Sequence, residues 1–176
     1  MVIKQTPFWL LCSKRTMPVS TIVLHHDAGA SDDSGLQYLI NLARAYVPNT
    51  KRKAASYHYY VGRDGTVTKC VPLSKKAWHC GVSHGPKGAN VNDYSIGIAL
   101  ANRGDGEEYP EVQLQAALAL VKEISKAIVG VKHLTTHRLC CEPNGRKIDP
   151  AFFDFIDFGA KTELEMWRSK GRTWNG

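Results

Sequence analysis

Helical and strand-like patterns alternate along this chain. Residues 36–47 and 114–128 repeat apolar side chains at the three-to-four spacing of an amphipathic helix. Short apolar runs at 19–25 and 94–101 have the length and composition of buried strands. An amphipathic helix needs a surface to cover, and a sheet supplies one. The order therefore predicts an α/β fold, a single domain in which a central mixed β-sheet is flanked by α-helices.

Residue types that favour helix ends mark where these two helices begin and end. Asp33 or Ser34 is expected to cap the first helix, and Pro48 to end it. The second helix is expected to begin near Pro110 and to end at Gly130. Each helix then presents one apolar stripe to the sheet.

An Asp64-Gly65 dipeptide separates two further strand-like runs, 57–63 and 66–71. This dipeptide tolerates the positive φ angles of a tight turn, so it predicts a β-hairpin. A shorter strand is expected at 76–80.

A third helix is expected to start at Pro150, because proline is favoured at the first helical position. Its apolar face would consist of Phe152, Phe155 and Ile156. The tail that follows, from Lys161, is amphipathic and mixed in charge.

The length of the chain, 176 residues, is that of one domain. We expect residues 19–176 to form this domain and residues 1–18 to form an N-terminal extension packed on it. The longest apolar run near the N-terminus, 8–12, has five residues and is too short for a signal-peptide core or a membrane span. Synthesis in the cytoplasm and the absence of a membrane span are therefore predicted.

The net charge of the chain is +7 at pH 7. A basic chain favours anionic partners, among them nucleic acid, acidic lipid and acidic cell-wall polymer. The basic residues are scattered and form no nucleic-acid recognition motif, so specific binding of nucleic acid is not expected. The five cysteines are an odd number without the spacing of a disulfide framework, and we expect free thiols.

Histidine is the residue type that points to chemistry, because the chain has seven. His25 and His26 end the first strand, where alternation turns them to opposite faces, so at most one faces a given site. Catalytic zinc takes three protein ligands and leaves a fourth position to water, and two histidines with one carboxylate are a recurrent set. His25, His137 and Asp149 could form such a set.

Two alternatives stay open for the third ligand position. Asp149 precedes Pro150, which is also what the start of a helix looks like, with a capping carboxylate and a first-turn proline. Cys140 lies three residues after His137 and competes for the position, because thiolate is a good zinc ligand.

Five blocks of sequence in a fixed order carry a family resemblance. The blocks are Ile22–His26, Ser56–Val61 with Arg63–Gly65, Ala77–Ser83, Asn92–Ile98, and Gly145–Pro150 after His137. Together they resemble the zinc-dependent N-acetylmuramoyl-L-alanine amidases, a family that includes amidase-type phage lysozymes, bacterial cytosolic and periplasmic amidases, and peptidoglycan recognition proteins. The resemblance covers about residues 19–155. It implies the α/β fold of these proteins and hydrolysis of the amide bond between N-acetylmuramic acid and L-alanine in peptidoglycan.

The resemblance also implies roles for individual residues. His25 resembles the first zinc ligand, His137 the second and Asp149 the third, for one Zn²⁺ ion per chain. Lys147 resembles the catalytic lysine two residues before the third ligand. Tyr57 resembles the catalytic tyrosine of the phage amidases, and we expect it at an inward position of a strand.

Other positions bear on substrate and mechanism. The Lys-x-Asp-Pro context favours the carboxylate over Cys140 as third ligand. Trp78 and His79 resemble positions close to the substrate groove, where an aromatic face can pack on sugar or peptide, with core packing as the alternative. His58 is expected to be a buried, hydrogen-bonded structural residue. Ala99 departs from the cytosolic recycling amidases, which have a catalytic glutamate there, so the group that protonates the leaving amine stays open.

These features predict a zinc-dependent peptidoglycan amidase. Ala99 and Tyr57 favour a phage endolysin, which acts on the wall of the infected host after release from the cytoplasm, over a cytosolic amidase that recycles muropeptides. A peptidoglycan-binding module without catalysis is a further alternative, disfavoured because Lys147 and all three ligand candidates are present. We expect a monomer whose partner is bacterial peptidoglycan.

Overall fold

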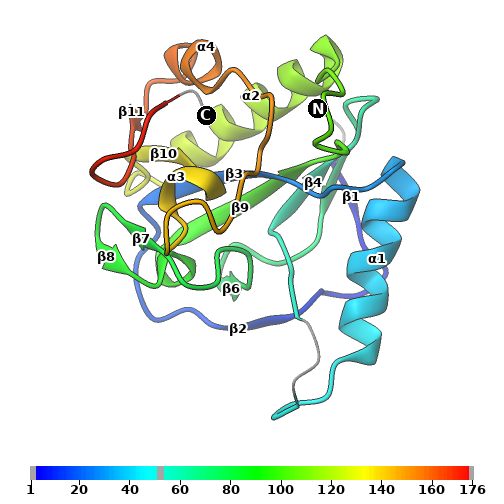
Figure 1. Ribbon diagram of the computed structural model, residues 1–176. Coiled ribbons are helices and arrows are strands. Elements are labelled where there is room, and N and C mark those ends of the chain that lie inside the picture. Colours follow the sequence, from blue (N-terminus) through cyan, green and yellow to red (C-terminus); the bar gives the residue numbers. More distant parts are fainter. Residues whose placement is uncertain (1–2, 51–53, 175–176) are drawn as a thin grey trace.

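The computed structural model describes residues 3–50 and 54–174. Its centre is a seven-stranded sheet in the order β1-β5-β4-β9-β3-β10-β11, with helices on both sides (Figure 1). The strands of this sheet are β1 (Ile3–Gln5), β3 (Thr21–His26), β4 (Tyr59–Val61), β5 (Val67–Lys69), β9 (Ser95–Leu100), β10 (His133–Thr136) and β11 (Glu165–Met166). The helices are α1 (Asp32–Ala45), α2 (Glu111–Ala127), α3 (His137–Cys140) and α4 (Phe155–Ala160).

Smaller elements surround the central sheet. Strand β2 (Cys12–Lys14) pairs antiparallel with β6 (Lys75–Ala77), and β7 (His84–Gly85) pairs antiparallel with β8 (Gly88–Ala89). A 3₁₀ helix, η1 (Val91–Asp93), leads into β9. Within the described ranges, no helix is both long enough and apolar enough to span a bilayer.

The central sheet is mixed, as the sequence predicts. Strands β4, β9, β3, β10 and β11 run parallel, whereas β5 pairs antiparallel with β4 and carries β1 beside it. In the register of β3, His25 lies beside Ala99 of β9, and Leu24 lies beside Thr136 of β10. Parallel strands end at the same edge of a sheet, and ligand sites favour that edge. The segments that follow β3 and β10 therefore emerge next to each other.

The main core fills one face of the sheet. Leu24 and Ile98 point to this face and pack against Leu120 and Val121 of α2, with Phe155 of α4 closing the same cluster. Full burial of such side chains contributes about 1.5–3 kcal/mol each. The predicted second helix is confirmed, and its apolar stripe covers this face.

Helix α1 packs on the opposite face, through Leu39 and Ile40 against Tyr60 and Ala99. Its N-cap residue is Ser31, whose side chain accepts a hydrogen bond from the backbone N–H of Ser34 in a reciprocal capping box. The cap therefore lies earlier than expected, because serine offers both an extended backbone and an acceptor oxygen at that position.

The predicted hairpin is present, with β4 and β5 joined through the turn at 62–66. Gly65 has a φ of 80°, the left-handed conformation that the Asp64-Gly65 dipeptide predicts. The strand expected at 76–80 is shorter and pairs with β2 instead of the central sheet.

The start predicted for the helix after Asp149, which is α4 in the structure, is wrong. The helix begins at Phe155, not at Pro150, because Phe152 has a φ of 54°, outside the helical region, and Asp154 caps the first turn. Of its expected apolar face, Phe155 is buried, whereas Phe152 and Ile156 are exposed. The segment between the third-ligand candidate and α4 is thus a loop at the surface.

Residues 3–18 belong to the folded body. Strand β1 forms an edge of the central sheet, and β2 joins the small sheet with β6. Arg15 donates hydrogen bonds to the backbone carbonyls of Leu73, Lys75 and Ser95. The guanidinium therefore connects this segment to β6 and β9.

Candidate active site

Two adjacent parallel strands bring the two histidines together. His25 lies in β3 and is fully buried, and His137 is the first residue of α3, directly after β10. Thr136 caps α3 by accepting a hydrogen bond from the backbone N–H of Leu139 at 3.3 Å, which sets the direction of the helix. The imidazole ring centroids of His25 and His137 are 4.7 Å apart.

Asp149 joins the two histidines from the loop that follows α3. Its Oδ2 atom lies 3.0 Å from Nδ1 of His25 and 3.0 Å from Nδ1 of His137. Its backbone carbonyl accepts a hydrogen bond from the N–H of Arg138, so the loop is attached to α3. One potential ligand atom of each of the three residues lies within 4.8 Å of the others. Two imidazoles and a carboxylate thus converge on one point.

The hydrogen bonds of His137 indicate which of its nitrogens carries a proton. Nε2 lies 2.9 Å from the carbonyl oxygen of Cys80, which only accepts, so Nε2–H is the donor. Nδ1 of the neutral ring then has a lone pair, and it faces a carboxylate oxygen of Asp149. Two acceptors this close repel unless a cation or an added proton lies between them. Zn²⁺ binds neutral imidazole and carboxylate, so the donor set fits this metal.

The ionisation of the group agrees with a metal site. Burial lowers the pKa of His25 to about 4, so its imidazole is neutral at neutral pH. The imidazole of His25 is therefore in the neutral form that binds a metal.

A cavity of about 310 Å³ opens above these side chains. Tyr57, Trp78, His137, Lys147 and Asp149 are among the residues that line it. A hollow of about 400 Å³ between α2 and α4 is larger, but none of the predicted site residues lines it. All of the predicted site residues except the fully buried His25 therefore line the smaller cavity.

Tyr57 lies against the first histidine. Its ring centroid is 4.9 Å from that of His25. The residue belongs to the extended segment before β4, and not to the strand itself as expected, because β4 begins only at Tyr59. Burial raises the pKa of the Tyr57 hydroxyl, and the negative charge of Asp149 adds to the effect. The hydroxyl is thus protonated at neutral pH and is able to donate a hydrogen bond.

Lys147 is exposed at the rim of the cavity, two residues before Asp149. Arg146, its neighbour, was not anticipated from sequence. The Arg146 guanidinium donates to the backbone carbonyls of Cys80 at 2.8 Å and Val82 at 2.7 Å. It connects the loop that carries Lys147 and Asp149 to the opposite wall of the cavity.

The two groove candidates, Trp78 and His79, both line the cavity but differ in exposure. Trp78 is half-buried and lines the cavity, with its indole N–H donating to Ser13 Oγ at 3.2 Å and its ring 5.3 Å from that of Tyr46. His79 lines the cavity as well but is only 6 % exposed, and its Nδ1 lies 3.0 Å from Nε2 of His25. That both residues contact substrate stays a prediction.

The other side chains weighed from sequence fall outside the ligand group. Cys140 is buried in a cluster with Val23, Cys80, Val91 and Tyr94. Its thiol is directed to the His137 carbonyl at 3.7 Å. The structure thus places Asp149, and not Cys140, with the two histidines. His58 is buried and hydrogen-bonded, as expected.

The sequence is similar to known amidases. The sequence model of a family described as N-acetylmuramoyl-L-alanine amidase matches residues 15–152. The 1,6-anhydro-N-acetylmuramyl-L-alanine amidase AmpD of Escherichia coli (strain K12) is 35% identical over 105 residues. That alignment covers 58% of this chain and 56% of the relative, so the chain matches little more than half the length of that protein.

Solved structures share the fold over nearly the whole chain. The crystal structure of a Se-Met AmpD derivative superposes with a TM-score of 0.73 and 26% identity, covering 91% of this chain and 94% of that one. The endolysin N-acetylmuramoyl-L-alanine amidase LysCS from Clostridium intestinale URNW superposes with a TM-score of 0.70 and 20% identity, covering 93% and 97%. At that identity, the second likeness concerns the fold alone.

Proposed function

The chain belongs to the N-acetylmuramoyl-L-alanine amidase family, and we propose that it hydrolyses the amide bond between N-acetylmuramic acid and L-alanine. The observation that carries the proposal is the convergence of Nδ1 of His25, Nδ1 of His137 and Oδ2 of Asp149 at one end of a cavity. Three ligands that leave one side open are the arrangement of catalytic zinc sites, whereas structural sites use four protein ligands.

The three converging residues would hold the metal. Zn²⁺ bound there would polarise the scissile carbonyl and lower the pKa of water to about 7. Two neutral imidazoles and one carboxylate leave a net positive charge at the site, which favours the negative charge that develops on the carbonyl oxygen. His25 and His137 are each held through Nε2, so that Nδ1 points to the shared position.

Tyr57 and Lys147 supply the remaining chemistry in this proposal. Tyr57 keeps its proton because its pKa is raised, so its hydroxyl donates a hydrogen bond to the developing oxyanion or to the attacking water. Lys147, at the rim of the cavity, adds a cation beside the same oxygen. A preorganised donor of this kind often contributes roughly 3–4 kcal/mol to transition-state stabilisation.

We propose a small 1,6-anhydromuramyl peptide as the substrate, which makes the protein a muropeptide-recycling amidase. The support comes from the AmpD relative, whose name specifies the 1,6-anhydro form of the sugar. Tyr57 and Ala99 favour an endolysin instead, but the similarity to known proteins supports the recycling alternative better, because the likeness to an endolysin lies at 20% identity.

An endolysin acting on intact cell wall stays the second candidate, because of one position. Ala99 lies beside His25 in the register of β9 and β3 and is fully buried. It carries no carboxylate where the recycling amidases that the sequence resembles have a catalytic glutamate. That difference favours a mechanism that depends on Tyr57 and Lys147.

A comparison of two substrates tests the proposal. Zinc-loaded protein is incubated with a 1,6-anhydro-N-acetylmuramyl-L-alanyl peptide and, separately, with intact sacculi, and the released peptides are quantified by mass spectrometry. We expect faster cleavage of the small substrate, with His137→Ala as the inactive control. Faster release from sacculi would favour the endolysin. Binding of either substrate without product would support a non-catalytic module and overturn the proposed activity.

A further inference from the structure

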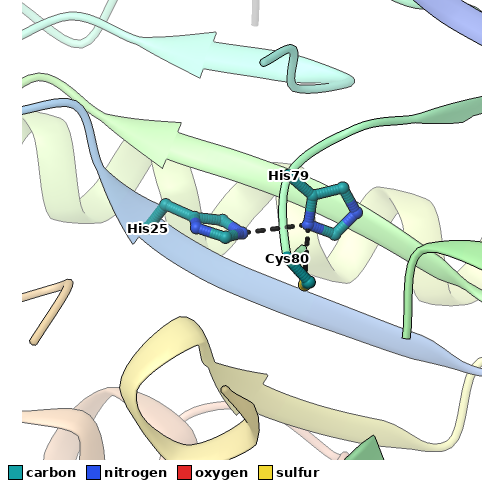
Figure 2. A group of neighbouring side chains, drawn as sticks. All are labelled: His25, His79 and Cys80. Atoms are coloured by element: carbon teal, nitrogen blue, oxygen red, sulfur yellow. Dashed lines mark hydrogen bonds between the residues drawn. The ribbon is translucent and has the colours of Figure 1, made fainter. Parts of the chain in front are cut away.

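A third histidine lies directly beside the ligand group. His79 Nδ1 is 3.0 Å from Nε2 of His25 (Figure 2). The other ring nitrogen of His25, Nδ1, faces Asp149. We propose that His79 is a positioning residue, which accepts the Nε2 proton of His25 in a hydrogen bond and so keeps the Nδ1 lone pair directed to the metal. The inference rests on the proposed zinc site and assigns to His79 a role other than contact with substrate.

The arrangement of protons follows from what a metal ligand requires. His25 binds a metal through Nδ1 only when Nδ1 is unprotonated, so its single proton has to reside on Nε2. An N–H buried this deeply needs an acceptor, and Nδ1 of His79 is within hydrogen-bond distance. His79 then carries its own proton on Nε2, where Ser95 Oγ accepts it at 3.2 Å. The chain of hydrogen bonds from Ser95 to His25 runs in one direction.

The opposite direction of this chain would disable the site. If Ser95 donated to His79 and His79 donated to His25, the proton of His25 would lie on Nδ1, facing Asp149. That tautomer has no lone pair available for the metal. The second ligand, His137, has an equivalent partner. Its Nε2–H donates to the carbonyl of Cys80, which fixes the tautomer of the ring with the lone pair on Nδ1.

Local packing holds the His79 ring in place. The backbone N–H groups of His79 and Cys80 both donate to Oδ1 of Asn92, at 3.1 and 2.9 Å. The ring packs directly against Gly97 of β9, where a Cβ atom would lie 2.6 Å from the ring. A glycine at this position allows the imidazole to lie flat on the sheet, and the ring has little freedom to turn away from His25.

His25, His79 and Cys80 could also hold an ion of their own, since one donor atom of each lies within 4.8 Å of the others. In that case Nε2 of His25 would be a ligand and not a hydrogen-bond donor. The Sγ of Cys80 lies 3.1 Å from Nδ1 of His79, a separation that a hydrogen bond explains without an ion (Figure 2). The two interpretations differ in stoichiometry, with one zinc ion per chain in ours and two in the other.

Two polar substitutions of His79 distinguish its nitrogens. The side-chain oxygen of asparagine occupies the place of Nδ1 and can accept from His25, whereas the terminal amide of glutamine occupies the place of Nε2. The zinc dissociation constant of full-length protein is measured by competition with a chromogenic chelator, for wild type, His79→Asn and His79→Gln. Circular dichroism and thermal unfolding of the metal-free proteins show whether both variants fold.

We expect His79→Gln to bind zinc roughly 10–100-fold more weakly than wild type, the usual cost of losing the partner of a metal-bound histidine. His79→Asn should stay within a few-fold of wild type. Equal affinities of the two folded variants would overturn the positioning role, and so would a second zinc ion in wild type that both variants lose. Failure of wild type to bind any zinc would instead overturn the proposed function.

If His79→Gln does not fold, Ser95→Ala provides the second variant. It removes the acceptor at the far end of the hydrogen-bond chain without changing either histidine. We expect a smaller loss of zinc affinity, of several-fold, together with a shift of the His25 ring proton from Nε2 towards Nδ1 in ¹⁵N NMR spectra of the metal-free protein. An unchanged tautomer and an unchanged affinity would contradict the inference.

Discussion

Nδ1 of His137 lies 3.0 Å from Oδ2 of Asp149. The segment after α3 brings these two residues, which are twelve positions apart, into contact. The opposite nitrogen of the ring donates to a backbone carbonyl, so the close pair consists of two acceptors. This contact is stable when a cation or an additional proton lies between the atoms. It is the contact in the structure that a bound metal ion would explain most directly.

The third ligand can be identified by comparing two substitutions. Asp149→Ala should lose the bound zinc, because it removes the only anion of the converging group. Cys140→Ser should keep one zinc ion per chain, since its thiol is directed to the His137 carbonyl and not to the histidine nitrogens. Zinc content after gel filtration, by plasma mass spectrometry, decides between them. The reverse pattern would move the third ligand to Cys140.

Tyr57→Phe and Lys147→Ala should separate catalysis from metal binding. Neither side chain belongs to the group of ligand atoms, so both variants should retain zinc. Each removes a donor near the cavity, and we expect kcat to fall by roughly 100-fold or more. Activity close to wild type in both variants would show that these residues do not stabilise the transition state.

Zinc should stabilise the folded protein. A ligand that binds only the native state at 100 times its dissociation constant contributes about 2.7 kcal/mol. For a chain of this length, that corresponds to a rise in Tm of roughly 5–10 °C. Differential scanning calorimetry with chelator and with added zinc measures the shift, and His25→Ala, which removes a ligand, should show almost none of it.

Acid should destabilise the metal-free protein through His58. Its Nδ1 accepts from the N–H of Gly97, its Nε2 faces the carbonyl of Lys75, and the Arg15 guanidinium lies 3.0 Å away. Burial lowers the pKa of His58 to about 3, below the value of about 6.5 in an unfolded chain. Unfolding therefore takes up a proton between these values, and stability falls as the pH drops from 6.5 towards 3.

His58→Asn tests this pH dependence, because its oxygen can replace Nδ1 as acceptor but does not titrate. The free energy of unfolding, from urea denaturation between pH 7 and pH 4, should depend on pH less steeply in the variant, by up to about 1.4 kcal/mol per pH unit for one proton. His25 contributes in the same direction in both proteins, because its pKa is also lowered. Parallel curves would contradict the assignment of this proton to His58.

Arg146→Ala should detach the loop that carries Lys147 from the opposite side of the cavity. The side chain connects the loop before Asp149 to the carbonyls of Cys80 and Val82. Without it, the loop that carries Lys147 gains freedom, and we expect kcat/KM to fall by roughly 10-fold while one zinc ion stays bound. Steady-state kinetics with a matched metal analysis measures both quantities. Loss of zinc would show that Arg146 acts through the ligands instead.

Long periodic segments explain why the fold could be predicted. Helix α2 repeats apolar residues over four turns, and the hairpin between β4 and β5 is marked by its Asp64-Gly65 turn. Strand β10 was not anticipated, because its four residues, His133–Thr136, are too few to show a period and include three polar side chains. The start of α4 was misplaced because a positive φ at Phe152 cannot be read from a local pattern.

The site could be predicted only in part. His25, His137 and Asp149 were identifiable because they lie in sequence blocks shared with the amidases. The role of His79 was not, because only the structure shows that this residue is buried with its Nδ1 beside Nε2 of His25, whereas its sequence neighbour Trp78 is half-buried. Contacts between distant segments, such as that of Arg146 with Cys80, have no signature in a single sequence.

A crystal structure of the zinc-loaded protein, with anomalous diffraction measured at the zinc edge, tests the central claim most directly. We predict one anomalous peak per chain, about 2.0–2.2 Å from Nδ1 of His25, Nδ1 of His137 and a carboxylate oxygen of Asp149. A peak bound through other atoms, or no peak within the cavity, would contradict the account.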